Sequence, residues 1–376
     1  MKGEAEVANG NGSRQPRGFH PIDKARDWWA DAPQWQRYGT YLVVLVLALI
    51  LPAPWIGSFM SPDSDWTNVL IFPIGTYILL AIGLNIVVGH AGMLDLGFVA
   101  FFAIGAYTLA TMSTKYGWAF WPTLVLGIFL AAMSGVILGA PTLRLRGDYL
   151  AIVTLGFGEI VRITANNTDA IGGAPGITNI PHPEPMFGVE FFLDPAPYYY
   201  LILFAIVLVI VFSVRLHKSR VGRAWAAIRE DEDAAELMGV PTFKFKLLAF
   251  AIGAMIGGFA GTIYASKAVY IAPPNFPFIL SATILAAVVL GGAGNLPGVI
   301  LGAFIVAWLP ERFRFLAEYR ILIFGFVLVL MMALRPEGLL PSRQRKAELR
   351  EGTGGMGAMG AEVAGPDSEA SAEVTK

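Results

Sequence analysis

The chain contains no cysteine and few charged residues, and these two features exclude several kinds of site and several classes of protein. Without cysteine it cannot form a disulfide, a zinc–thiolate site or a catalytic thiol. Only 15% of its 376 residues are charged, against about 25% in ordinary globular domains, while 55% are hydrophobic. The net charge of −1 gives no basic footprint for a nucleic acid, and the four histidines are too scattered to suggest a metal site. This composition indicates a polytopic membrane protein.

Long apolar runs predict the helices that cross the bilayer. A spanning helix needs about 20 mostly apolar residues. The sequence supplies ten such segments, so the expected fold is all-α, with about ten transmembrane helices. The segments are 39–56, 67–88, 92–112, 118–140, 149–165, 198–214, 247–266, 279–291, 296–309 and 320–334. The region 279–309 has a second interpretation, a re-entrant hairpin.

The distribution of Lys and Arg predicts the orientation, because cytoplasmic segments are enriched in these residues. They are frequent in 1–38, in the loop 215–246 and after residue 340, whereas the loop 166–197 has acidic residues and no basic ones. Ten crossings place both termini in the cytoplasm and the acidic loop outside. Only Arg312 and Arg314 do not fit this arrangement.

The same patterns divide the chain into three parts. Residues 1–38 form a polar, cytoplasmic N-terminal segment, and 39–340 form the transmembrane domain. The tail 341–376 is also expected in the cytoplasm. It is expected to be disordered because it contains little that could build a core.

The loop 215–246 is too polar for the membrane but has the pattern of a helix. Good helix formers run from Gly222 to Gly239, and Gly239 followed by Pro241 is a helix stop. An apolar stripe and a charged block within this helix would suit a docking surface. The stripe consists of Ala224, Ile228, Ala235 and Met238, and the charged block is 229–233. A solvated connector that follows the charge rule is the other interpretation.

Several segments of the sequence resemble known motifs. Asp233-Ala234-Ala235-x-x-x-Gly239 resembles the E-A-A-x-x-x-G coupling motif of ABC importer permeases, with Asp in place of Glu and without the motif's later Ile and Leu-Pro. The longer strings at 222–240, 83–107, 143–163 and 274–303 are similar to one family, the LivM type of branched-chain amino acid ABC transporter permease. The resemblance covers about 40–345 and implies a type II importer-like permease fold built from repeat-like halves.

The resemblance also implies partners for the loop. In the family a coupling helix lies in a groove of a cytosolic ATPase, so Asp233, Ala234, Ala235 and Gly239 would make this contact, with Arg229 and Glu230 at its rim. No G-x-x-x-x-G-K-[ST] motif occurs, so the chain is expected to be no enzyme and to bind no cofactor, with ATP and Mg²⁺ on the partners. The expected partners are two ATPase subunits, a second homologous permease, an extracytoplasmic substrate-binding protein at the loop 166–197, and membrane lipid.

Two glycine-rich breaks interrupt the apolar segments. One contains Gly89 and Gly92, and the matching one contains Gly291, Gly292, Gly294 and Asn295. Corresponding breaks in two halves are typical of transporters built from repeats and point to the substrate path. Close helix packing through small residues is the alternative. The parity of the predicted spans places both breaks on the same side of the membrane.

Charged residues within the predicted spans are few and therefore informative. Asp95 follows the first break, where it could serve as a structural cap or as a gate on the substrate path. Glu159 and Arg162 are three residues apart, and a structural ion pair is the simplest account of them.

These observations favour a permease subunit of an ATP-driven importer for branched-chain amino acids, located in the plasma membrane. A permease of the same family for urea, amides or a sugar is an alternative, since no residue here identifies the substrate side chain. A stand-alone secondary transporter is another, and it would need Asp95 or Glu159 as its ion site.

Overall fold

The structure, a computed structural model, consists of helices and connecting loops. It describes residues 43, 46–60, 65–143, 148–185, 190–191, 195–312, 325–326, 329 and 338–340. The chain forms two units, 1–51 and 52–376, and the site lies in the second. Within the described ranges the only β-type pairing is one antiparallel bridge between Ile177 and Ile271.

Within the described residues, five helical segments are long and apolar enough to cross a membrane, as expected for a polytopic membrane protein. They are Trp66–His90, α7 (Phe120–Thr142), α9 (Ala196–Lys218), α12 (Thr242–Ala268) and Pro273–Gly291, which contains α13 (Phe278–Gly291). The shorter or more polar α6 (Val99–Tyr116), α8 (Asp148–Asn167) and α14 (Leu296–Arg312) coincide with three further predicted spans. The predicted spans 39–56 and 320–334 lie largely outside the described residues, so the structure does not establish the number ten.

The segment Trp66–His90 is not one regular helix. It contains α4 (Trp66–Val69), the π-helix η1 (Leu70–Gly75), α5 (Thr76–Asn85) and a second π-helix, η2 (Ile86–His90). Phe72, before Pro73, has extended dihedral angles, φ −140° and ψ 123°, and interrupts the helix there. Proline removes a backbone donor and crowds the preceding turn, which explains the position of this break.

Helix α12 packs against both α6 and α7 through small residues. A Cβ atom added to Gly105 of α6 would lie 2.1 Å from the carbonyl oxygen of Gly258, and one added to Gly261 would lie 2.0 Å from the carbonyl oxygen of Phe102. A Cβ added to Gly258 would lie 2.4 Å from the Cβ of Ala131 on α7. Glycine at these positions lets the backbones approach closely, as is common between membrane helices.

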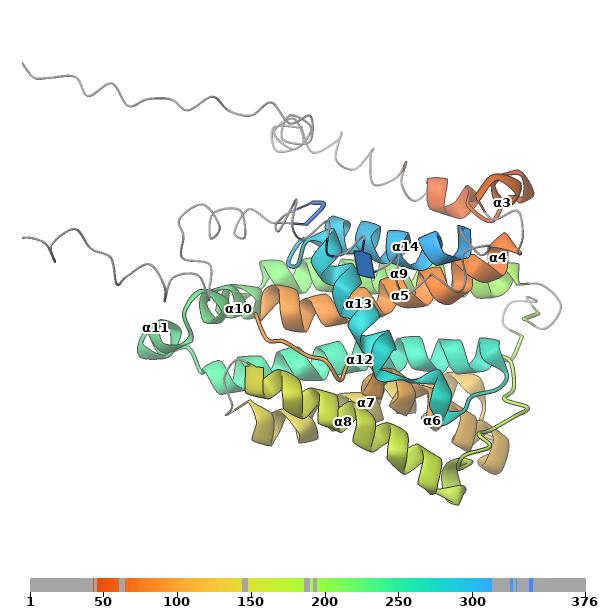
Figure 1. The fold of residues 1–376 in the computed structure, drawn as a ribbon, viewed down its shortest axis with the longest axis horizontal. Coiled ribbons are helices and arrows are strands. Elements are labelled where there is room, and N and C mark those ends of the chain that lie inside the picture. Colours follow the sequence, from red (N-terminus) through yellow and green to blue (C-terminus); the bar gives the residue numbers. More distant parts are fainter. Residues whose placement is uncertain are drawn as a thin grey trace, which may run out of the picture. The chain divides into compact units, whose positions relative to one another are not determined.

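The two ends of this unit are easily recognised (Figure 1). The short helices α10 (Arg220–Glu230) and α11 (Glu232–Leu237) lie at one end, hereafter the α11 end. The connection 168–185 marks the other, hereafter the loop end, where it pairs with the segment after α12 through the Ile177–Ile271 bridge. The short helix α3 (Pro54–Met60) also lies at the loop end, where Trp308 Nε1 of α14 donates to the Met60 carbonyl at 3.2 Å.

Candidate functional site

The polar loop between α9 and α12 folds into two helices where we predicted one. Ser219 caps α10, its Oγ accepting a hydrogen bond from the Val221 N–H at 3.1 Å. Asp231 then adopts extended dihedral angles, φ −154° and ψ 113°, and its carboxylate accepts from the Ala234 N–H at 2.9 Å, which starts α11. The prediction of a single helix over 222–239 was wrong because Asp231 is a helix N-cap, a position that breaks helical geometry.

Two contacts attach this pair of helices to the start of α12. Trp225 of α10 is fully buried, and its Nε1 donates to the carbonyl of Phe245 at 2.7 Å. Lys246, which is also buried, forms an ion pair with Glu232 at the start of α11. A displacement of α11 is therefore passed directly to α12.

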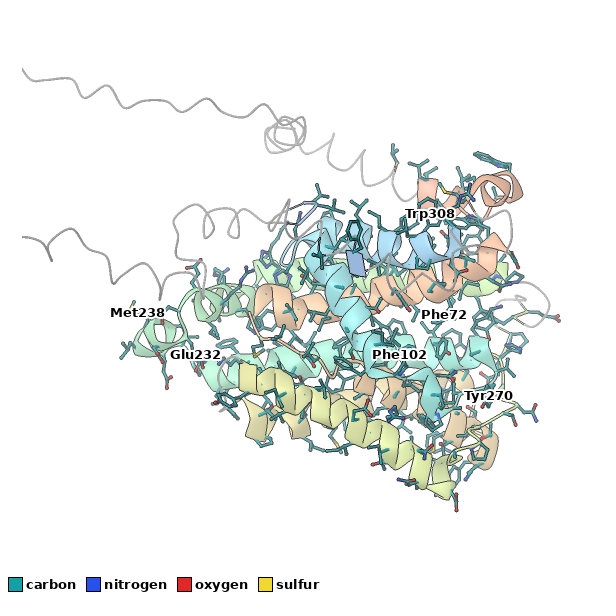
Figure 2. All side chains as sticks on the ribbon, viewed as in Figure 1. Phe72, Phe102, Glu232, Met238, Tyr270 and Trp308 are labelled. Carbon is teal, nitrogen blue, oxygen red and sulfur yellow. The ribbon has the colours of Figure 1, made fainter. Side chains whose placement is uncertain are left out.

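The surface of α11 presents apolar side chains to the exterior. Leu237 and Met238 are 89% and 85% exposed, the largest exposed fractions of any large apolar residue in the described part of the chain. Figure 2 shows Met238 pointing outward at the extremity of the α11 end, with Glu232 on the side of α12. We call Asp233, Ala234, Leu237, Met238 and Gly239, all exposed, the α11 tip.

The α11 tip differs in one respect from the surface that the motif predicts. Ala235 is buried, 5% exposed, and so are Ile228 and Trp225, so these residues hold the helices in place. The prediction that Met238 shares their apolar stripe was wrong, because the break at Asp231 changes the direction of the chain. Leu237 was missed, although a Leu-Met pair just before a helix-ending glycine was the signal available.

Gly239 ends α11 in the left-handed region, with φ +85°, as the Gly-x-Pro helix stop predicts. No atom lies within 4 Å of the position its Cβ would take. Its requirement for glycine is therefore conformational and not steric.

Arg229 faces the membrane helices, whereas the motif had placed it at the rim of an ATPase contact. Its Nη1 donates to the carbonyl of Gly89 at 2.6 Å. A Cβ on Gly92, where φ is +72°, would lie 2.9 Å from Cγ of Arg229. Glu230, by contrast, is exposed. Arg229 thus joins α10 to the first glycine break.

The two glycine breaks contact one another, on the same side as the predicted spans require. Oδ1 of Asn85 accepts a hydrogen bond from the Gly294 N–H at 2.8 Å. A Cβ on Gly89 would lie 2.5 Å from the same Gly294 nitrogen. The second break is the turn between α13 and α14, where Gly292 and Gly294 have positive φ of 105° and 86°.

The second break is also fixed from the C-terminal side. Asn295 Nδ2 donates to the carbonyl of Leu340 at 2.7 Å, and the Leu340 N–H donates to the carbonyl of Gly291 at 3.1 Å. Gly291 packs on Gly298, since its Cβ would lie 2.2 Å from that residue's carbonyl oxygen. The predicted break residues therefore form one tightly packed cluster beneath α10.

Asp95 begins the connection from the first break to α6 and is fully buried. Its Oδ1 accepts from the Gly97 N–H at 2.8 Å, and the neighbouring Leu96 N–H donates to Oγ1 of Thr154 on α8 at 3.0 Å. Within the described residues its Oδ2 has no hydrogen-bond partner. Of the two interpretations of Asp95, these contacts fit the cap, because the carboxylate organises the turn before α6.

Glu159 and Arg162 form the ion pair that their spacing predicts. Nε and Nη2 of Arg162 both lie 2.8 Å from Oε2 of Glu159. Elsewhere in the described ranges, no group of three or more His, Asp or Glu side chains is placed to hold a metal ion.

At the loop end the acidic residues have different surroundings. Glu184 accepts from the Phe120 N–H at the start of α7, at 3.1 and 3.3 Å from its two oxygens, so it caps that helix. Asp169 and Glu190 are exposed, and Asp194 lies outside the described residues. His182 Nδ1 lies 2.6 Å from Oη of Tyr198, and burial together with the charge of Lys267 lowers the pKa of His182 below its usual value of 6.5.

Comparison with known proteins gives the same assignment as the sequence motifs. Residues 68–333 match the family described as the permease component of branched-chain amino acid transport systems. The chain is 44% identical to the high-affinity branched-chain amino acid permease LivM of Escherichia coli, over 82% of this chain and 77% of that protein. It is 26% identical to the permease LivH of the same organism, over 70% and 91%, and 24% identical to the fructose import permease FrcC of Rhizobium meliloti, over 78% and 83%. No solved structure matches.

Proposed function

This chain belongs to the family of branched-chain amino acid transport permeases, and on that premise we propose that it moves branched-chain amino acids into the cell as one subunit of an ATP-driven importer. The 44% identity to a branched-chain amino acid permease supports this substrate over the sugar of the fructose permease, where identity is 24%.

The exposed α11 tip is the observation that most strongly supports coupling of transport to a partner ATPase. Leu237 and Met238 are almost fully exposed on α11, which the Glu232–Lys246 ion pair attaches to α12 next to the contact between Trp225 of α10 and Phe245. Exposed apolar side chains on a rigid support are typical of a protein interface. We assign the tip to a groove of a cytosolic ATPase, and the basic residues of the loop 215–246 support its location on the cytoplasmic side.

The contacts behind the tip suggest how ATPase movement would reach the substrate path. A shift of α11 would move α10, and Arg229 would transmit it to Gly89 and Gly92. The second break would follow through the hydrogen bond between Asn85 and Gly294. Such transporters alternate between outward-open and inward-open states when their packed helices switch between two discrete arrangements.

The complete importer would contain other chains. We propose two ATPase subunits that bind ATP and Mg²⁺, a second homologous permease, and a substrate-binding protein at the loop end. The likeness to both LivM and LivH, two permeases of one organism, supports a permease pair. Both termini then lie in the cytoplasm.

The experiment is co-purification from the native membrane with an affinity tag on this chain. We expect ATPases with phosphate-binding loops and a second permease in the wild-type preparation, identified by mass spectrometry. The double variant Leu237→Ser/Met238→Ser should keep the permease and lose the ATPases. The control Tyr116→Ser changes an exposed aromatic residue at the other end, 67% exposed, and should retain both. A wild-type chain that purifies alone and folded would favour the secondary transporter.

A further inference from the structure

Glu159 and Arg162 lie near the middle of α8, far from both ends of the helix. With a rise of about 1.5 Å per residue, Glu159 is about 16 Å from Asp148 and about 12 Å from Asn167 along the axis. The sequence predicts that α8 crosses the membrane, although α8 is more polar than the five most apolar helical segments. Charged side chains within a membrane span face the protein interior or water, because exposure to lipid is costly.

The pair is nevertheless not covered by this chain. The side chains of Glu159 and Arg162 are 33% and 34% exposed. Both close contacts end at the same oxygen, Oε2, so Oε1 of Glu159 and Nη1 of Arg162 make no hydrogen bond within the described part of the chain. A purely self-neutralising pair would have no need of an open side with a free acceptor and free donors.

We propose that Glu159 and Arg162 bind the charged head of the transported amino acid, Glu159 its ammonium group and Arg162 its carboxylate. This inference rests on the proposed function, since it requires an amino acid as substrate. An amino acid crosses the membrane as a zwitterion whose two charges are attached to one carbon atom, and Glu159 and Arg162 are close enough to meet both. The planar guanidinium suits a carboxylate through two parallel hydrogen bonds.

The ion pair also avoids an unpaired charge in the membrane when no substrate is bound. Without substrate the two side chains neutralise one another, so no isolated charge remains in the membrane. When the substrate binds, the Glu159–Arg162 ion pair is replaced by two ion pairs with the substrate, and the net charge of the site stays zero. The branched side chain is not read by this pair, which leaves discrimination among hydrophobic amino acids to other residues or to the binding protein.

The site is connected to the glycine breaks through α8 itself. Thr154 of α8 accepts the Leu96 N–H, and a Cβ on Gly97 would lie 1.9 Å from the Thr154 carbonyl oxygen. Glu159 is five residues further along, about 8 Å by the helical rise. Movement of the first break by Arg229 would therefore shift the helix that binds the substrate, because α8 packs against α6 and α7 in the same bundle (Figure 1).

The test is leucine uptake by the complete importer, reconstituted in liposomes with its binding protein. The variant Glu159→Arg/Arg162→Glu keeps a three-residue ion pair but exchanges the positions of the charges. We expect its maximal uptake rate to fall more than tenfold, with an unchanged half-saturating concentration of loaded binding protein and unchanged assembly. The control Ile160→Val, at an exposed apolar position of the same helix, should transport normally.

Three other outcomes would contradict either the substrate-binding role of the pair or the proposed function. Normal uptake by the swapped variant would show that only an ion pair is required, and the substrate assignment would be wrong. Loss of the second permease from an otherwise abundant swapped chain would identify a subunit contact and overturn it too. If the wild-type importer takes up no leucine, the proposed function fails, and this inference fails with it.

A second measurement leaves the ion pair intact. It tests the proposal even if the variant Glu159→Arg/Arg162→Glu is not produced. The natural chain has no cysteine, and Gly156, one turn before Glu159, has no atom within 4 Å of its Cβ position. We expect Gly156→Cys to react with a charged, water-soluble thiol reagent and leucine to slow that reaction. The control Phe129→Cys, on an exposed and wholly apolar stretch of α7, should not react. An inert Gly156→Cys would exclude a water-filled path at this pair.

Discussion

Arg229 and the glycines beneath it show how single residues connect the cytosolic helices with the membrane helices. The Arg229 side chain packs against Gly92, and its guanidinium donates to the carbonyl of Gly89. The sequence predicts that Gly89 and Gly92 form a break, because they match the glycine cluster 291–294 in the second half of the chain. It does not predict that Arg229 lies on them, because 140 residues separate Arg229 from Gly89.

Arg229→Gln should therefore reduce transport without releasing the ATPases. A hydrogen bond from a charged group contributes about 1.5–3 kcal/mol, and each 1.4 kcal/mol corresponds to about tenfold, so uptake should fall about tenfold or more. The measurement is leucine uptake together with ATPase activity of the reconstituted importer. Arg223→Gln, an exposed arginine on the same helix, is the matched control and should behave as wild type. Equal uptake by both variants would exclude Arg229 from the coupling path.

Gly239→Val should uncouple ATP hydrolysis from uptake. The position has φ +85°, which a β-branched residue adopts only with strain, so the end of α11 must rearrange. Gly239→Asn is the control, because asparagine tolerates this conformation and open space surrounds the Cβ position. We expect hydrolysis without uptake in the valine variant and near-normal uptake in the asparagine variant. Normal uptake by the valine variant would show that the conformation of Gly239 is not needed for coupling.

At the scale of helices, small residues determine how closely α12 packs on its neighbours. Gly261→Ala should lower stability by about 1–3 kcal/mol, the usual cost of overpacking, because its Cβ would lie 2.0 Å from the Phe102 carbonyl oxygen. Gly156→Ala, with open space at Cβ, should change stability little. Thermal unfolding of the two purified variants in one detergent measures the difference. Equal midpoints would mean that α6 and α12 can separate without cost.

The packing of the loop end should depend on pH through His182. Its pKa is lowered in the folded state, so between that value and 6.5 the unfolded chain binds more protons. Stability therefore falls as the pH drops through about 6.5 and is retained above it. Limited proteolysis of 168–185 should be faster at pH 5.5 than at pH 7.5. In His182→Gln, which retains a polar partner for Tyr198, the two rates should be closer; an equal change in both proteins would assign the effect to other groups.

Most elements, though not their irregularities, follow from the apolar pattern of the sequence. Eight of the predicted spans fall on helices, since an uncharged run of about 20 residues in a membrane has few other stable forms. The interruption at Phe72 and the division at Asp231 were missed. A proline inside an apolar run and an aspartate before Glu232 were the available signals, but each also fits an unbroken helix. Tertiary contacts, such as Trp225 with Phe245, decide between the two.

At the scale of the whole molecule, contacts between distant segments form the site. The two glycine breaks match in sequence, and Asn85 joins them directly across 209 positions through Gly294. No periodicity predicts this contact, because it depends on how α5, α13 and α14 pack together. The family assignment suggests the partner subunits that this chain lacks. In our proposal the α11 tip contacts the ATPase, and the α8 ion pair contacts the substrate.

The central claim is that this chain is the permease of an ATP-driven importer of branched-chain amino acids. The most direct test is uptake of labelled leucine into liposomes that contain the purified complex, with binding protein outside and ATP enclosed. The account predicts leucine accumulation that needs both components and stops when a non-hydrolysable nucleotide replaces ATP. Accumulation without ATP, driven by an ion gradient across the liposome membrane, would contradict it.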